Sequence, residues 1–226
     1  MTCVNLFWVE VGVSERAKRD QPPQDESLFH YGSLYRKLLD PLIKPARAAI
    51  VDRIPANSSV LDIGCGTGLL CFELRREKHC SVTGIDLSLK MLDFARSNNP
   101  FQDIEFFHQN ATDMQSFQDR QFDYVVVLNV IHELEPTDRL KLLAEALRVG
   151  THVILFDSNV PLPWNGVGIV KRLIEITFGI DHYPHFKSYL SSGGIMGILD
   201  AYGHSLKIVE RSSFAQSCNQ LVHATG

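Results

Sequence analysis

The sequence lacks three features, each of which would define a class of protein. Its five cysteines form no CxxC pair and are odd in number, which fits neither a disulfide framework nor a zinc site. The formal charge is −4 and no basic block exceeds a few residues, so binding along a nucleic-acid backbone is not expected. No stretch approaches the roughly 20 apolar residues of a membrane span. We expect no metal site, no membrane span and no nucleic-acid partner.

The beginning of the chain carries no recognisable targeting signal. Leu6–Val11 is apolar but short, contains Glu10 and lacks the basic start of a secretion signal. Together with the cysteine usage, this predicts a cytoplasmic protein in a reducing compartment. The 226 residues, 45% apolar and 21% charged, suit one large globular domain, which we expect to span 1–226.

Short apolar runs alternate with helical segments through the middle of the chain. Runs such as Tyr124–Leu128 are apolar throughout, which is typical of strands covered by helices on both faces. This alternation predicts an α/β fold with a doubly wound, mainly parallel sheet. The expected strands are 59–63, 81–86, 104–109, 122–128 and 151–157, followed by 206–211 and 220–224.

Proline and glycine positions predict where several helices begin and end. Pro41 and Pro45 should divide the segment before residue 55 into shorter helices, with Pro45 in a first turn. Thr137 is expected to cap the helix that ends at Gly150. The eight-residue link between the last two strands is too short for a crossover helix and favours a terminal β-hairpin over 206–226.

Three glycines follow the first strand at alternate positions, Gly64, Gly66 and Gly68, and a helix-forming segment comes next. Such a turn leaves backbone open to a ligand beside the positive end of a helix. The spacing is GxGxG rather than the GxGxxG of dinucleotide-binding proteins. Asp62 precedes the glycines, where its carboxylate could accept the ammonium of an amino-acid-like ligand. Cys65 is interpreted as a small spacer.

Asp86 ends the second strand, 18 residues after Gly68. An acidic residue at that strand tip is placed to bind the two hydroxyls of a ribose, and it disfavours a phosphorylated ribose. The alternative is that Asp86 caps the following helix, although Ser88 could serve as that cap instead.

The segment Asp62–Gly68 resembles the cofactor loop of the class I S-adenosylmethionine-dependent methyltransferases, and the resemblance covers residues 56–157. It implies a Rossmann-like sheet of seven strands with the last strand antiparallel. It also implies S-adenosylmethionine as cofactor and S-adenosylhomocysteine as product. The branch it is similar to methylates small molecules in ubiquinone and menaquinone biosynthesis.

The resemblance also assigns cofactor contacts outside the glycine loop. The adenine edge, usually met by Asp-Ala, would fall to Asn110-Ala111, which departs from the family pattern, and Asp113 is a neighbouring alternative. Asn129 would line the methionine end. The remaining implied contacts are Leu87 and Met91 beside the ribose acid, and Tyr31 and Tyr35 closing over the cofactor, for which simple cap packing is the alternative.

Two regions can roof the acceptor site beyond the strand ends: a helical N-terminal cap over 1–45 and a lid insertion over 158–205. The pattern Ile169, Val170, Leu173, Ile174 in the insertion is open to another interpretation, an ordinary helix packed on the core. If the reaction needs a general base, the candidates are His132, His182 and His185. The alternative for each is a structural or surface histidine.

The loop after the fourth strand reads Asn129-Val130-Ile131-His132 and lacks the Asn-Pro-Pro-Tyr signature of enzymes that methylate amino groups of nucleobases or glutamine amides. We therefore expect a methyltransferase acting on O, N or C of a small acceptor, as a monomer or homodimer. The alternatives are a cofactor-binding module without methyl transfer, a non-methylating use of the same cofactor, and an NAD-type oxidoreductase.

Overall fold

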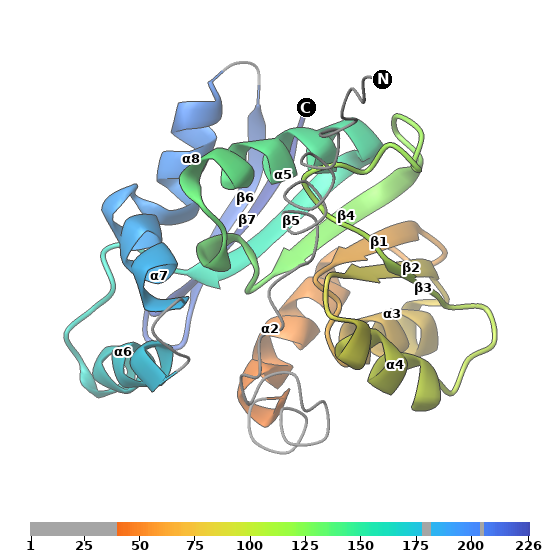
Figure 1. Ribbon diagram of the computed structural model, residues 1–226, viewed down its shortest axis with the longest axis horizontal. Helices are drawn as coiled ribbons and strands as arrows, with labels where there is room; N and C mark the ends of the chain where they lie inside the picture. Colours follow the sequence, from red (N-terminus) through yellow and green to blue (C-terminus); the bar gives the residue numbers. More distant parts are fainter. Residues whose placement is uncertain (1–39, 178–181, 204–205) are drawn as a thin grey trace, which may run out of the picture.

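The computed structural model describes residues 40–177, 182–203 and 206–226, which build a seven-stranded sheet with helices on both faces (Figure 1). The strand order is β3-β2-β1-β4-β5-β7-β6. Only β7 runs antiparallel to its neighbours, which confirms the predicted fold class. The strands are β1 Ser59–Ile63, β2 Ser81–Asp86, β3 Glu105–His108, β4 Phe122–Leu128, β5 Gly150–Ser158, β6 Lys207–Phe214 and β7 Asn219–Thr225.

The order of the strands reverses beside β1. β1 pairs with β2 on one side and with β4 on the other, and all three are parallel. Loops that leave the carboxyl ends of β1 and β4 therefore diverge toward opposite faces of the sheet. Such a divergence opens a crevice where α/β proteins bind ligands.

Helices α2, α3 and α4 cover one face of the sheet, while α5, α7 and α8 cover the other. Figure 1 shows α6 apart from both layers, beyond the tip of β5. The helices are α2 Asp40–Arg53, α3 Leu69–Lys78, α4 Leu89–Ser97, the short 3₁₀ helix η2 Ile131–Glu133, α5 Pro136–Val149, α6 Gly166–Thr177, α7 His182–Ser191 and α8 Gly194–Tyr202.

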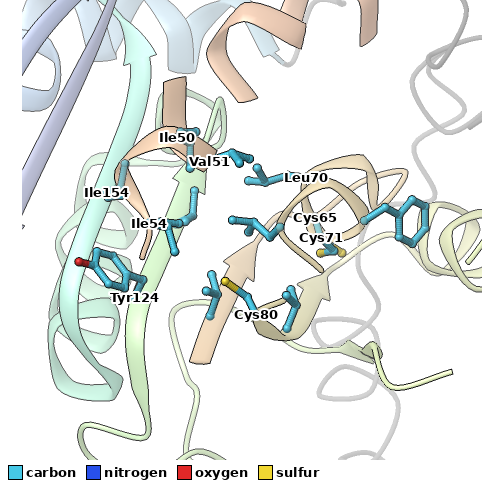
Figure 2. Packing of buried hydrophobic residues seen from close by; sticks show 14 of the residues in the cluster. Ile50, Val51, Ile54, Cys65, Leu70, Cys71, Cys80, Tyr124 and Ile154 are labelled. Carbon is cyan, nitrogen blue, oxygen red and sulfur yellow. The ribbon is translucent and has the colours of Figure 1, made fainter. Parts of the chain in front are cut away.

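The core beneath α2 and α3 is continuous and apolar, as Figure 2 shows. Ile50 and Ile54 of α2 are fully buried, and they pack in one cluster with Leu70 of α3 and Ile154 of β5. Burying a side chain of this size contributes roughly 1.5–3 kcal/mol. This packing holds α2 and the start of α3 against the sheet, next to the crevice.

α2 runs without a break from Asp40 through Pro45, so the prediction that Pro45 begins a new helix is wrong. Pro41 lies in the first turn, where the backbone N–H groups have no partner within a helix, whereas Pro45 is the sixth residue and lies inside the helix. The guanidinium of Arg47 donates to the backbone oxygen of Asp40 (3.3 Å) and reinforces this first turn.

Two other element ends differ from the sequence expectation. α5 begins at Pro136, with Glu135 rather than Thr137 at the capping position, because proline suits the first helical residue. The terminal hairpin forms as predicted, but its link is only Ala215–Cys218. Polar residues extend β6 because it is an edge strand with its outer face in solvent. The predicted Ser88 cap is confirmed, since its hydroxyl accepts from the N–H of Met91.

α6 forms as a helix, but it does not pack its apolar residues on the core. Ile169, Val170 and Leu173 are 45%, 55% and 57% exposed, so the alternative of ordinary core packing is wrong for these side chains. Tyr31, Tyr35 and the cap as far as residue 39 lie outside the described residues. In the part of the chain that the structure describes, no helix is long and apolar enough to cross a membrane.

Two histidines meet on the sheet, far from the crevice. Nδ1 of His152 in β5 lies 3.0 Å from Nε2 of His223 in β7, and the His152 ring stacks on Tyr124. Burial first, and then the neighbouring His152, lower the pKa of His223 below its usual value. The folded state therefore holds His223 neutral at a pH where the unfolded chain already binds a proton.

This pair should make stability depend on pH in a defined direction. The contribution of neutral His223 is full above pH of about 6.5 and is lost as the pH falls below that value. We expect the unfolding free energy of the wild type to fall more between pH 7.5 and pH 5.5 than that of His223→Gln, measured by urea unfolding. The control is His79→Asn at the exposed end of α3. Equal losses in the wild type and His223→Gln would contradict this account.

Candidate functional site

The three glycines of the loop after β1 have different structural roles. All have positive φ, +69° at Gly64, +51° at Gly66 and +78° at Gly68. A Cβ at Gly64 would lie 2.3 Å from Val130, and one at Gly68 would lie within 3.2 Å of three side chains. A Cβ at Gly66 would meet nothing within 4 Å. Gly64 and Gly68 thus serve packing, and Gly66 faces open space where a ligand can approach.

Backbone hydrogen bonds and one carboxylate fix the glycine loop. The N–H groups of Gly64 and Cys65 donate to the backbone oxygen of Ile85 at 2.8 and 3.0 Å. The Asp86 carboxylate accepts from the N–H of Gly66 (2.8 Å) and from the N–H of Ser88 (2.8 Å). Asp86, which the sequence analysis predicts to bind a ribose, therefore holds the loop after β1 to the tip of β2.

A pocket opens at this loop, between α2, the end of β1, the start of α3 and the end of β4. It brings together several residues predicted from the sequence. These are Asp62, Gly64, Cys65, Gly66 and Asn129. The side chains on the rim are both acidic and basic, so the pocket suits a zwitterionic ligand.

Asp62 lies at the bottom of this pocket and is only 2% exposed. Its carboxylate accepts a hydrogen bond from the Cys71 thiol (3.2 Å), and Figure 2 shows the Cys71 and Cys65 side chains next to each other. The pKa of Asp62 is raised to about 7, mainly by burial and also by the charge of Asp86, while the Cys71 hydrogen bond and Arg47 lower it in part. A cation entering the pocket would favour the ionised form of Asp62.

A chain of charged side chains supports the pocket from α2. The Thr67 hydroxyl donates to the Asp40 carboxylate (3.2 Å), Arg47 lies 3.4 Å from the same carboxylate, and Arg47 also pairs with Glu73 of α3 (3.0 Å). Asp40, Arg47 and Thr67 line the pocket, and the sequence analysis did not select them. Sequence gives no signal for contacts between Asp40 and a loop 27 residues away.

The residues assigned to the adenine and ribose lie along one edge of the sheet. Asn110 is exposed, and its side-chain oxygen accepts from the N–H (3.0 Å) and the hydroxyl (2.9 Å) of Thr112. Ala111 packs against the core below. Leu87 is 48% exposed, whereas Met91 is buried. Asn110 and Leu87 therefore lie on an open surface rather than in an enclosed cavity, whereas Met91 lies in the core.

β4 ends in a strained turn that leads to His132. Asn129 adopts a left-handed conformation with φ +55°, and its N–H donates to the backbone oxygen of Phe156 (2.8 Å). The next residues form η2, which carries His132 beneath the lid. This turn links the cofactor-side pocket to the buried histidine in three residues.

His132 is buried between two carboxylates. Its Nδ1 lies 2.8 Å from Asp157 of β5, its Nε2 lies 3.7 Å from Glu175 of α6, and the Phe186 ring meets its ring edge-on. Burial alone would lower the pKa of His132, but Asp157, Glu175 and Glu133 raise it to about 9. At neutral pH the ring is therefore an imidazolium, which holds a proton rather than accepting one.

The other two histidines lie on α7. His185 is partly exposed, and its backbone oxygen accepts from the buried Arg139 (2.7 Å). Arg139 also donates to the backbone oxygen of Ile131, so it fastens α7 to η2. His182 begins α7, and its side chain lies outside the described residues. His132 follows the pocket-lining Asn129 by three residues.

Residues 60–151 match the family model of the methyltransferase domain. They hold β1 to the start of β5, and with them the glycine loop, Asp86 and Asn129. This match confirms the resemblance of this part of the chain to the class I S-adenosylmethionine-dependent methyltransferases.

Curated relatives match the methyltransferase domain over part of their length. A ubiquinone biosynthesis O-methyltransferase of Aromatoleum aromaticum is 33% identical over 122 residues, 52% of this chain and 52% of that protein. A putative methyltransferase of Geobacillus sp. (strain WCH70) is 44% identical over 70 residues, 30% of this chain and 27% of that protein. The chain thus spans about half the length of these relatives, or less.

A solved structure shares the fold over nearly the whole chain. The S-adenosylmethionine-dependent methyltransferase of Aquifex aeolicus superposes with a TM-score of 0.59 at 18% identity, covering 85% of this chain and 97% of that one. At this identity the similarity extends to the fold alone. The described sheet and its helices are therefore similar in fold to that methyltransferase.

The methyltransferase loop gives a matched pair of substitutions. Gly66→Ala should cost only the left-handed strain of about 1–2 kcal/mol, because its new methyl group meets open space. Gly64→Ala should lower the unfolding free energy more, because it overlaps Val130 as well. Urea unfolding of both variants measures the difference, and Val130→Ala should restore part of the loss in Gly64→Ala. Equal losses at the two positions would contradict the packing role of Gly64.

Proposed function

We propose that this protein transfers a methyl group from S-adenosylmethionine to an O, N or C atom of a small-molecule acceptor. The observation that carries the proposal is the open space at Gly66, between the Asp62 and Asp86 carboxylates, in a pocket at the switch point of the sheet. A methyl-donating cofactor is consistent with the match of residues 60–151 to the methyltransferase domain.

The residues present fit this cofactor. Asp62 is the acid at the bottom of the pocket and suits the ammonium of the methionine part. Asp86 suits the ribose hydroxyls, since its carboxylate is a hydrogen-bond acceptor at the end of β2, beside the open position at Gly66. Asn110 and Ala111 would flank the adenine. When bound, the cofactor supplies a methyl carbon already activated by its sulfonium.

The remaining work of the protein is to position the acceptor, exclude water and hold a proton where needed. The lid helices α6 and α7 cover the tip of β5, where Asp157 meets His132. With a pKa of about 9, His132 would hold its proton at neutral pH and would act as a base only in more alkaline solution. An acceptor that needs no base, such as an unprotonated amine, fits this state as well.

Binding and product mass test the proposal directly. We expect the full chain to bind S-adenosylhomocysteine in isothermal titration and to bind NAD⁺ weakly or not at all. Asp86→Ala should weaken S-adenosylhomocysteine binding at least tenfold, because the ribose hydroxyls lose their acceptor. Transfer of mass from methyl-labelled cofactor to an acceptor separates methylation from other uses of the cofactor. No binding at millimolar S-adenosylhomocysteine would contradict the proposal.

The pKa of Asp62 adds a pH signature to this binding. If its carboxylate pairs with the ligand ammonium, only the ionised form binds, and below pH of about 7 a proton competes. We expect the Kd of S-adenosylhomocysteine to rise about tenfold from pH 8 to pH 6, as one-proton linkage requires. Asp62→Asn should bind more weakly with a flat profile. A flat profile in the wild type would rule out the Asp62 assignment.

A further inference from the structure

The lid helix α6 turns its polar side toward the molecule and its apolar side outward. Glu175 is 5% exposed and Lys171 is partly buried, whereas Leu173 and Ile176 are 57% and 50% exposed. A surface helix that packs on a core shows the opposite arrangement. What lies beneath α6 is therefore a polar site at the tips of β5 and β7.

Lys171 meets a neutral partner in that site. Its ammonium donates to the side-chain oxygen of Asn219, the first residue of β7. In the described ranges of the chain, no carboxylate oxygen lies within 4.0 Å of this ammonium. The two acids nearest to it, Asp157 and Glu175, are engaged by His132. Burial lowers the pKa of Lys171, and the attraction of Asp157 and Glu175 from beyond 4.0 Å offsets this only in part. An anion bound at the ammonium would stabilise its charged form, so the site favours an anionic ligand.

A buried hydroxyl lies on the same face of the sheet as Asn219, the hydrogen-bond partner of Lys171. Ser158 is 1% exposed, and its Oγ has no hydrogen-bond partner among the described residues. Ser158 pairs with Asn219 across β5 and β7, and directly opposite residues of an antiparallel pair share one face. Buried polar groups are nearly always satisfied, so an unpartnered hydroxyl beside Asn219, the partner of Lys171, points to a missing acceptor atom.

The location connects this cluster to the cofactor side. Ser158 is two residues after Phe156, which pairs with Leu128, and Leu128 lines the cofactor pocket. We propose that Lys171, Ser158 and Asn219 bind an anionic oxygen of the methyl acceptor, either a carboxylate or an ionised hydroxyl. This inference rests on the proposed function, since it assigns the acceptor to the strand tips next to that pocket.

Matched anionic and neutral probes test the cluster. The probes are benzoate against benzamide, and 4-nitrophenolate against nitrobenzene, titrated at pH 8 into the full chain with and without S-adenosylhomocysteine. We expect at least one anionic probe to bind ten times more tightly than its neutral partner. Lys171→Gln should reduce that preference to twofold or less, and Ser158→Ala should weaken anion binding at least threefold. The control, Lys187→Gln on the exposed side of α7, should keep the full preference.

The two arms of the experiment separate this inference from the proposed function. Affinity for S-adenosylhomocysteine should be the same in the wild type and all three variants, and loss of this binding in the wild type would contradict the proposed function alone. Equal binding of both members of each probe pair by the wild type would overturn the anion site. The anion site would also be overturned if Lys171→Gln, with an unchanged thermal midpoint, kept the preference for the anionic over the neutral probe. The probe pair that responds distinguishes a carboxylate from an ionised hydroxyl.

Discussion

The hydrogen bond from the Gly66 N–H to the Asp86 carboxylate is the contact on which the rest of the site depends. It joins the loop after β1 to the tip of β2, and the same carboxylate accepts from Ser88 at the start of α4. One side chain thereby sets the entry of two helices and the shape of the pocket. Parallel strands make this possible, because their carboxyl ends lie side by side at one edge of the sheet.

The two parts of the site, one around Gly66 and one around His132, differ in their side chains. At Gly66 the absence of a side chain leaves the backbone accessible to a ligand. Gly64 and Gly68 are glycines because Val130 and Phe72 leave no room for a Cβ. Around His132, in contrast, charged side chains fill the strand tips. The first part is suited to a ligand of fixed shape, and the second to polar recognition.

Sequence predicted the sheet and the cofactor loop because both depend on local patterns. β1, β2 and β4 were placed to the residue, since apolar runs bounded by turn residues carry that signal. Asp40, Arg47 and Glu175 were not selected, because their roles come from contacts with residues 26 to 43 positions away. The orientation of α6 was not predicted either, because its apolar pattern indicates a helix but not which side faces the rest of the molecule.

The burial of ionisable groups argues that the strand tips serve a ligand rather than stability. Asp62, Asp157, His132 and Glu175 are each at most 5% exposed. Replacing a buried ion pair by apolar side chains of similar volume is often neutral or stabilising, so selection for the fold alone gives no reason to keep four such groups. Their pKa values point the same way, since Asp62 is raised to about 7 and His132 to about 9. A zwitterionic cofactor at Asp62 and a polar acceptor near His132 would each give these charges a partner.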